Sequence, residues 1–231
     1  MLRTLFKKEF RGAWRTYRLP ITLAVLLAIG LISPLLAKYT PVILRSVPDM
    51  PAALADLIPE PTVGEAVAQY IKNISQFGVL LVIVVTMGIV AGERERGTAV
   101  MLLTKPVRPS AVILAKWLSA MLGLLMGLAL AAGGCALYTM LLFEPIDAGA
   151  FLALNGLLYV FLGVSLTLAL LASTLATTQA LAAAGAFGLL VVMLILGALP
   201  RIGEYMPGEL LSWGGTLFMD GGNSGWAALG V

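Results

Sequence analysis

Long apolar stretches separated by short polar segments dominate the pattern of this chain. Several of these stretches carry no charge, and a helix needs about 20 apolar residues to cross the hydrocarbon of a bilayer. The pattern therefore predicts an all-α integral membrane protein with five complete transmembrane helices. The predicted spans are residues 21–37, 74–92, 117–143, 151–172 and 179–199.

The fourth and fifth spans come from one charge-free run, residues 151–199. A single helix over this run would be about 74 Å long, more than twice the thickness of the hydrocarbon. The run must therefore fold back on itself. A polar cluster marks the expected turn and consists of Ser173, Thr174, Thr177, Thr178 and Gln179.

The third predicted span, residues 117–143, would be about 40 Å long as a helix. It must therefore tilt or extend beyond the hydrocarbon. Lys116 stands at its inner end, where a lysine can snorkel to the headgroups.

Residues 1–19 alternate aromatic or aliphatic side chains with six basic ones, near helical spacing. This pattern predicts an amphipathic helix that lies on the membrane surface. A secretory signal peptide is the alternative, because a basic segment precedes an apolar run. The segment is long and aromatic-rich, however, and no A-x-A-like cleavage site follows.

The remaining polar segments are interpreted as loops of a single transmembrane domain, residues 1–231. Residues 38–73 are rich in proline and contain a predicted short helix from Glu65 to Ser75, so they form an ordered external loop. Residues 200–225 form a second external loop. Residues 226–231 begin a new apolar stretch, which we interpret as the start of a sixth span, and we expect the chain to be truncated within it.

The distribution of lysine and arginine predicts the orientation of the spans. The first segment holds six of these residues and the loop 93–116 holds five, so 11 of the 15 lie on one side. Nine of the 12 acidic residues lie on the other side. By the positive-inside rule the amino terminus and the loop 93–116 are cytoplasmic. The predicted location is the cell membrane, plasma or inner, with several passes.

Composition excludes several classes of function. The chain is 60% hydrophobic and 12% charged, and its net charge of +3 comes from residues beside the spans, so we expect no nucleic-acid partner. It contains no histidine and one cysteine, Cys135, so we expect neither a metal site nor catalytic residues. The predicted spans hold no charged side chain, which argues against ion-coupled carriers and against intramembrane proteases and other membrane enzymes.

Small and polar residues within the spans indicate how the helices pack. Gly123 and Gly127 lie four residues apart in the third span and allow close helix approach, within this subunit or at a dimer seam. Asn155, Ser165 and Thr167 in the fourth span either line a polar route or hydrogen-bond to neighbouring helices.

The segment GERERGTAVMLLTKPVRPSAVILAK, residues 92–116, is the most informative part of the sequence. Alternating charges follow a membrane exit, Gly97 and Thr98 then suggest a turn, and an apolar patch precedes two prolines. Such a segment either anchors a loop at the headgroups or holds a short helix that transmits force from a soluble partner.

The order of these motifs resembles the permease subunits of type-2 ABC exporters. The resemblance rests on a basic first helix containing KEF, a second span running into GERERGT, and MLLTKPVRPSAVILAKW leading into the third span. It covers essentially the whole chain in span order. That family usually has six spans, so the carboxyl end of this chain departs from its pattern.

The resemblance implies that the first cytoplasmic loop couples the permease to a separate ABC ATPase. The residues that match the motif are Glu93, Glu95, Gly97, Thr98, Leu102, Leu103, Pro106 and Arg108. It further implies a second permease, identical or paralogous, and ATP with magnesium on the partner ATPase, with no cofactor on this chain. The sequence itself contains no G-x-x-x-x-G-K-[ST] motif. The alternative function is a non-transport membrane scaffold or assembly factor.

Overall fold

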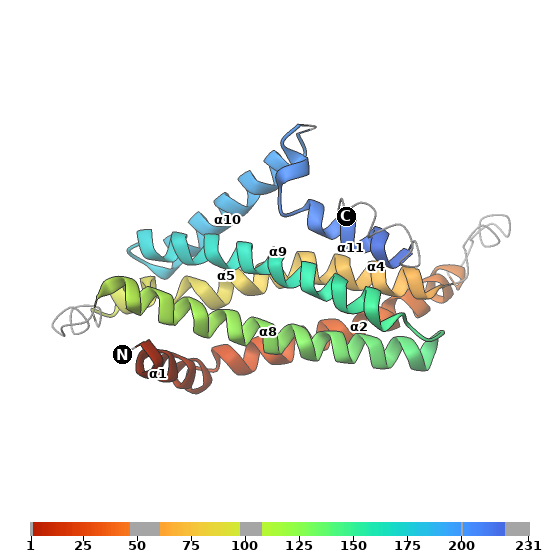
Figure 1. The fold of residues 1–231 in the computed structure, drawn as a ribbon, viewed down its shortest axis with the longest axis horizontal. Coiled ribbons are helices and arrows are strands. Elements are labelled where there is room, and N and C mark those ends of the chain that lie inside the picture. The colour runs from red at the N-terminus through yellow and green to blue at the C-terminus, as the bar shows by residue number, and fades with distance from the viewer. Residues whose placement is uncertain (1, 47–60, 98–107, 200, 220–231) are drawn as a thin grey trace.

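The computed structural model describes residues 2–46, 61–97, 108–199 and 201–219, and over these residues the chain forms helices and no strand. Figure 1 shows an elongated bundle in which the long helices run beside one another. The helices are α1 (Leu2–Arg15), α2 (Arg18–Arg45), α4 (Val63–Asn73), the π-helix η1 (Ile74–Gly78), α5 (Val79–Met87), α6 (Ala91–Glu95), α8 (Pro109–Leu142), α9 (Ala148–Leu175), α10 (Gln179–Gly197), the 3₁₀ helix η2 (Gly203–Tyr205) and α11 (Glu209–Met219).

Five of the described segments are helical, long and apolar enough to cross a membrane. They are Arg18–Ile43, Val63–Glu95, Pro109–Leu142, Ala148–Leu175 and Gln179–Gly197. This confirms the predicted all-α class and its five membrane-spanning segments. The structure contains no bilayer, so the cytoplasmic position of the amino terminus stays a prediction.

The amphipathic first helix is shorter than the predicted residues 1–19. It ends at Arg15, because Tyr17 adopts a left-handed conformation with φ of 59° and α2 begins at Arg18. None of the residues of α1 is buried. The helix lies against α8 and the start of α2, at the end of the bundle that also holds α6. We call this the inner end, following the predicted orientation.

The second span begins much earlier than residue 74. Thr62 and Glu65 form a reciprocal capping box that starts α4, and α4, η1 and α5 follow one another without an interruption. The residues of α4 that are buried recur three and four positions apart: Ala66, Val67, Tyr70 and Asn73. Charged Glu65 and Lys72 interrupt the hydropathy, which is why the sequence pattern placed this helix in an external loop.

The first span likewise extends beyond residues 21–37. Helix α2 continues to Arg45 and includes Pro34 and Pro41. The described part of the predicted loop 38–73 is therefore mostly helical. The predicted loop 200–225 also contains a helix, α11, which packs against α9 and α4. The predicted sixth span, residues 226–231, lies outside the described residues.

Helices α2 and α8 form the most extensive contact of the bundle. A Cβ atom on Gly127 would lie 2.6 Å from Cδ1 of Leu26, and one on Gly123 would lie 2.9 Å from Cδ1 of Leu19. On the facing helix, a Cβ on Gly30 would collide with the backbone of Ala131. The absent side chains let the two backbones approach closely, which is how helices associate in lipid.

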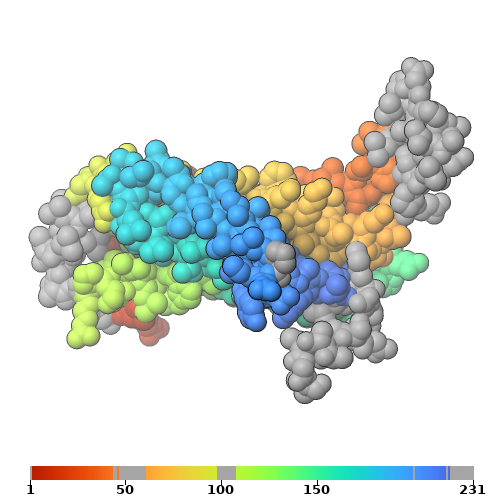
Figure 2. All heavy atoms as spheres, turned by 90° about the horizontal axis from the view of Figure 1, so that it is seen from above, coloured from red at the N-terminus to blue at the C-terminus, as the bar shows by residue number. Residues whose placement is uncertain are grey.

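Helices α9 and α10 differ in how deeply they are buried. The most apolar part of α9 is 56% buried, whereas that of α10 is 17% buried. In Figure 1 the carboxyl-terminal part of α10 points away from the bundle, and Figure 2 shows α10 and α11 on one surface of the molecule. Helix α9 is therefore a core helix, and α10 presents most of its surface outward.

Candidate functional site

The predicted coupling residues begin where the second span ends. Glu93 and Glu95 lie in α6, Gly97 follows it, and Arg108 is the residue that precedes α8. Thr98, Leu102, Leu103 and Pro106 lie outside the described residues. Pro109 occupies the first turn of α8, where its missing N–H leaves no helical bond unmade. Residues 109–116 are therefore helical, so the predicted loop 93–116 ends at Arg108.

The helix is interrupted between α5 and α6, and a serine hydroxyl from another helix hydrogen-bonds to the backbone groups at this interruption. The Ser173 Oγ accepts hydrogen bonds from the backbone N–H of Val90 at 3.2 Å and of Ala91 at 3.1 Å. The same hydroxyl donates to the carbonyl oxygen of Met87 at 3.0 Å. Since helix ends leave backbone groups unpaired, Ser173 satisfies three of them at once and fixes the break to α9.

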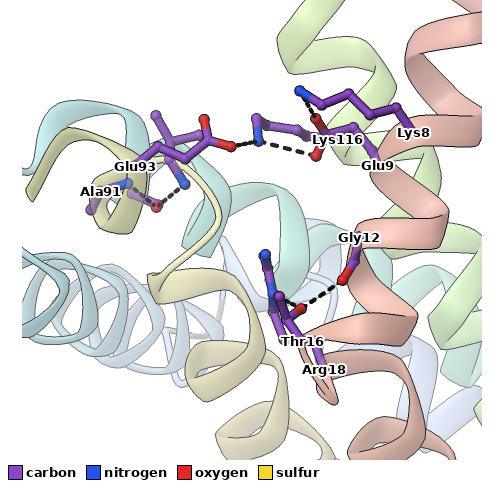
Figure 3. Close-up of polar contacts among 10 residues, drawn as sticks. Lys8, Glu9, Gly12, Thr16, Arg18, Ala91, Glu93 and Lys116 are labelled. Atoms are coloured by element: carbon purple, nitrogen blue, oxygen red, sulfur yellow. Dashed lines mark hydrogen bonds and ion pairs between the residues drawn. The ribbon is translucent and has the colours of Figure 1, made fainter. Parts of the chain in front are cut away.

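Lys116 joins the first loop to the first helix. Its Nζ lies 2.6 Å from Oε1 of Glu93 and 3.1 Å from Oε2 of Glu9. Figure 3 shows the lysine between the two carboxylates. The lysine side chain is only 3% exposed, whereas those of Glu9 and Glu93 are 15% and 30% exposed. Lys116 therefore does not snorkel to the headgroups as the sequence predicted. It is the central cation of an ion cluster between α1, α6 and α8.

Arg94 and Glu95 connect the same loop to the turn between α9 and α10. Arg94 Nη1 donates to the carbonyl oxygen of Ala176 at 2.9 Å. The backbone N–H of Gln179 donates to Oε2 of Glu95 at 3.2 Å. Thr178 caps α10 by accepting from the N–H of Leu181, so the chain reverses inside the polar cluster. We call the set of contacts from Arg94 and Glu95 to Ala176 and Gln179 the loop clasp.

Two glycines make room for the side chain of Gln179 beside this clasp. A Cβ on Gly88 would lie 2.9 Å from Oε1 of Gln179, and one on Gly92 would lie 3.3 Å from its Cδ. Contacts this close force a neighbour to move. The glycines at the end of α5 and in α6 therefore allow α10 to pack against the start of the loop.

Gly97 sets the direction in which the chain leaves α6. It has φ of +70°, a left-handed conformation that L side chains rarely adopt, and it directly follows the C-cap residue Arg96. A glycine at this position ends a helix at low cost. The match of Gly97 to the family motif thus has a conformational explanation.

A small cavity of about 40 Å³ lies next to the ion cluster. Glu9, Arg18, Lys116 and Ser119 contribute to its lining. Within the described part of the chain, the buried Ser119 Oγ has no hydrogen-bond partner. A cavity of this size with several polar groups has room for ordered water.

Three residues of this inner-end site escaped sequence reasoning. Glu9 is the one acidic residue of a basic helix, a signal that could have marked it as facing the protein. Ser173 and Gln179 were interpreted only as turn residues. Their roles depend on contacts with residues more than 80 positions away, which no local pattern contains.

The three polar residues of the fourth span, Asn155, Ser165 and Thr167, are hydrogen-bonded to the protein. Tyr70 Oη donates to Oδ1 of Asn155 at 2.8 Å. Ser165 donates to the carbonyl of Phe161, and Thr167 donates to that of Gly163. Trp117 Nε1 donates to Oγ1 of Thr167 at 3.0 Å. These contacts favour helix packing over a polar route for Asn155, Ser165 and Thr167.

Over its described residues the site connects segments of the chain, and no nucleophile is paired with a base there. Charge pairs and backbone bonds fasten residues 93–95 to α8 and to the turn between α9 and α10, and Lys116 extends this connection to α1. Such an arrangement can transmit a displacement of the loop to α1, α8 and the turn between α9 and α10.

Comparison with known proteins identifies a family that matches this chain and a protein that is similar to it. Residues 3–203 match a family described as ABC-2 family transporter protein. The chain is also 26% identical over 231 residues to an uncharacterized transmembrane protein, YxlG, of Bacillus subtilis strain 168. That alignment covers 98% of this chain and 90% of the relative.

Proposed function

Because this chain belongs to the family of ABC-2 transporter proteins, we propose that it forms the translocation pathway of an ATP-driven exporter and couples to a separate ABC ATPase through its first loop. Membership of the family makes the chain a multi-pass permease component of an ABC transporter. The proposal adds the outward direction of transport, the docking loop and the residues that transmit the motion.

One observation carries the coupling assignment: the start of the loop, residues 93–95, is bonded to α8 and to the turn between α9 and α10, and through Lys116 to α1. Lys116 joins it to α1 and α8, and the loop clasp joins it to the turn between α9 and α10. A partner that pulls on residues 93–108 would therefore move several helices together. A loop that only anchored the chain at the headgroups would have no need of these contacts.

The ATPase partner would bind ATP and magnesium, and two permeases would enclose the pathway. ATP binding can change the permease only if the ATP-bound partner binds one permease state better than the other. Differential binding at residues 93–108 would supply this preference. The spans carry few charged side chains away from their ends, which favours apolar or amphipathic cargo moved by ATP over ion-coupled uptake.

The test is co-purification with the ABC ATPase that is encoded beside this protein, followed by measurement of ATP hydrolysis and transport. We expect a stable complex. In it, Arg94→Ala with Glu95→Ala would leave assembly intact but lower the coupling between ATP hydrolysis and transport at least tenfold, an energy of about 1.4 kcal/mol. The matched control is Glu204→Ala with Arg201→Ala, two exposed residues that follow the carboxyl end of α10.

Two results would contradict the proposal. If the chain purifies without any ATPase, the scaffold or assembly function takes its place. If the complex forms but the clasp variant transports like the unmodified protein, residues 94 and 95 have no part in coupling.

A further inference from the structure

Helix α1 separates its charges onto two sides. Arg3, Lys7, Arg11 and Arg15 follow one another at intervals of four residues, so they form one stripe along the helix. All four side chains are exposed. Glu9, the one acidic residue of α1, lies away from the stripe and pairs with Lys116 at 3.1 Å. The basic stripe therefore faces out of the bundle.

Aromatic residues lie beside this stripe. Trp14 is 56% exposed and Tyr17 is 71% exposed. Tryptophan and tyrosine concentrate where the hydrocarbon meets the headgroups, because one end of each ring system is apolar and the other is polar. On the remaining face, the rings of Phe6 and Phe10 stack with centroids 6.0 Å apart.

From this arrangement we infer that α1 binds the phosphate headgroups of anionic phospholipids. The row of cations is complementary in charge to an anionic leaflet. The exposed aromatic rings beside it suit the depth at which the headgroups meet the hydrocarbon. Each lysine or arginine near such a surface contributes roughly a fivefold change in binding at low salt. The occupant is the lipid surface itself, and the inference needs no ATPase.

Lipid contact at the stripe has a consequence for the rest of the site. Glu9 lies in the same rigid helix and pairs with Lys116, which in turn pairs with Glu93. Anionic lipid bound to α1 would hold Glu9 against Lys116 and so stabilise the ion cluster. The lipid composition of the leaflet would then influence the start of the proposed coupling loop.

The experiment uses the full chain in lipid vesicles, with Trp14 as its one tryptophan. Trp117→Phe, Trp213→Phe and Trp226→Phe remove the other three of the four tryptophans. The vesicles contain phosphatidylglycerol and phosphatidylcholine in fixed proportion, and the bromine that quenches tryptophan is carried by one lipid or by the other. We expect brominated phosphatidylglycerol to quench Trp14 as if it were enriched there by roughly fivefold or more at low salt.

A second variant neutralises the stripe with Arg3→Gln, Lys7→Gln, Arg11→Gln and Arg15→Gln. We expect the enrichment of phosphatidylglycerol at Trp14 to fall to about one, and high salt to have the same effect on the unmodified stripe. The matched control, Lys72→Gln with Arg201→Gln, removes exposed cations far from α1 and should retain the enrichment. Circular dichroism and gel filtration check that each variant remains folded.

Equal quenching by the two brominated lipids in the unmodified stripe would overturn the inference. Retention of the enrichment after neutralisation would also overturn it, because the stripe would then not be its source. If the neutralised variant instead loses a co-expressed ATPase while lipid quenching is unchanged, the stripe binds protein and the lipid assignment is wrong. None of these readouts depends on transport, so they remain informative if the proposed exporter function fails.

Discussion

The ammonium of Lys116 lies 2.6 Å from the carboxylate of Glu93, so the first residues of α8 and the end of the second span are held by a charge pair. The lysine is almost fully buried, and Glu9 approaches the same ammonium from α1. Burying a single cation between two carboxylates ties three segments together. Loss of these contacts should lower the stability of the protein, and one buried side chain provides a probe of unfolding.

That probe is Cys135, the single cysteine of the chain, which is buried in α8. A thiol-reactive dye labels it only when the surrounding helices separate. The temperature of half-maximal labelling therefore measures unfolding in detergent, and each variant below can be compared with the unmodified protein by this measurement.

Lys116→Met should destabilise the protein, because it leaves Glu9 and Glu93 without their shared cation. Removing one member of a buried ion pair costs roughly 3–5 kcal/mol, and we expect a smaller loss here because both carboxylates are partly exposed and Glu9 also lies 3.7 Å from Lys8. Adding Glu9→Gln and Glu93→Gln should restore part of the loss. Lys72→Met, at an exposed lysine of α4, should change the labelling temperature little. Equal effects of the two lysine variants would contradict the ion cluster.

Ser173→Ala should loosen the break between α5 and α6. The variant leaves the N–H groups of Val90 and Ala91 and the carbonyl of Met87 without their side-chain partner. Unsatisfied buried groups cost about 1–3 kcal/mol. Hydrogen exchange at residues 87–92 should therefore accelerate, while Ser212→Ala on the exposed face of α11 should leave it unchanged. Unchanged exchange in the Ser173 variant would show that the hydroxyl does not hold the break.

Gly88→Ala should displace the side chain of Gln179, because the added Cβ would lie 2.9 Å from its Oε1. Because the atom that must move is the far end of a flexible side chain, we expect a loss near or below the lower end of the roughly 1–3 kcal/mol that overpacking costs. Combining Gly88→Ala with Gln179→Ala should recover most of the loss, so a double-mutant cycle would give a coupling energy near the lower end of the range of about 0.5–3 kcal/mol. Gly156→Ala is the control, since a Cβ there meets nothing within 4 Å. If the effects of Gly88→Ala and Gln179→Ala on stability are additive, the side chain of Gln179 does not contact position 88.

Gly127→Ala should separate α2 from α8. Its Cβ would lie 2.6 Å from Cδ1 of Leu26 and 3.4 Å from the carbonyl oxygen of Thr22. We expect a loss of about 1–3 kcal/mol, partly recovered by Leu26→Ala, which vacates the space. Gly133→Ala in the same helix has open space around its Cβ and should be tolerated. If Gly127→Ala and Gly133→Ala change the stability equally, α2 and α8 do not approach one another as closely as described.

The sequence predicted the coarse fold because the ability of a segment to cross a bilayer depends on its own residues and not on distant ones. A helix must be apolar over a fixed length to cross the hydrocarbon, so its presence can be recognised from its own residues. The same length limit required the charge-free run 151–199 to fold back, and the chain reverses between Leu175 and Gln179. Helix ends were less predictable, since α4 has one buried face and charged residues on its exposed one.

The sequence by itself determined the five spans of the described residues, the amphipathic first helix and the position of the loop motif. Only the tertiary structure decided which polar groups meet. Glu9 and Lys116 are 107 positions apart, and Arg94 reaches a carbonyl 82 positions away. Such contacts depend on which faces of which helices pack together, and hydropathy does not specify a helix's rotation or its neighbours. For this reason Lys116 was expected at the headgroups, whereas packing against α1 and α6 buries it between two carboxylates.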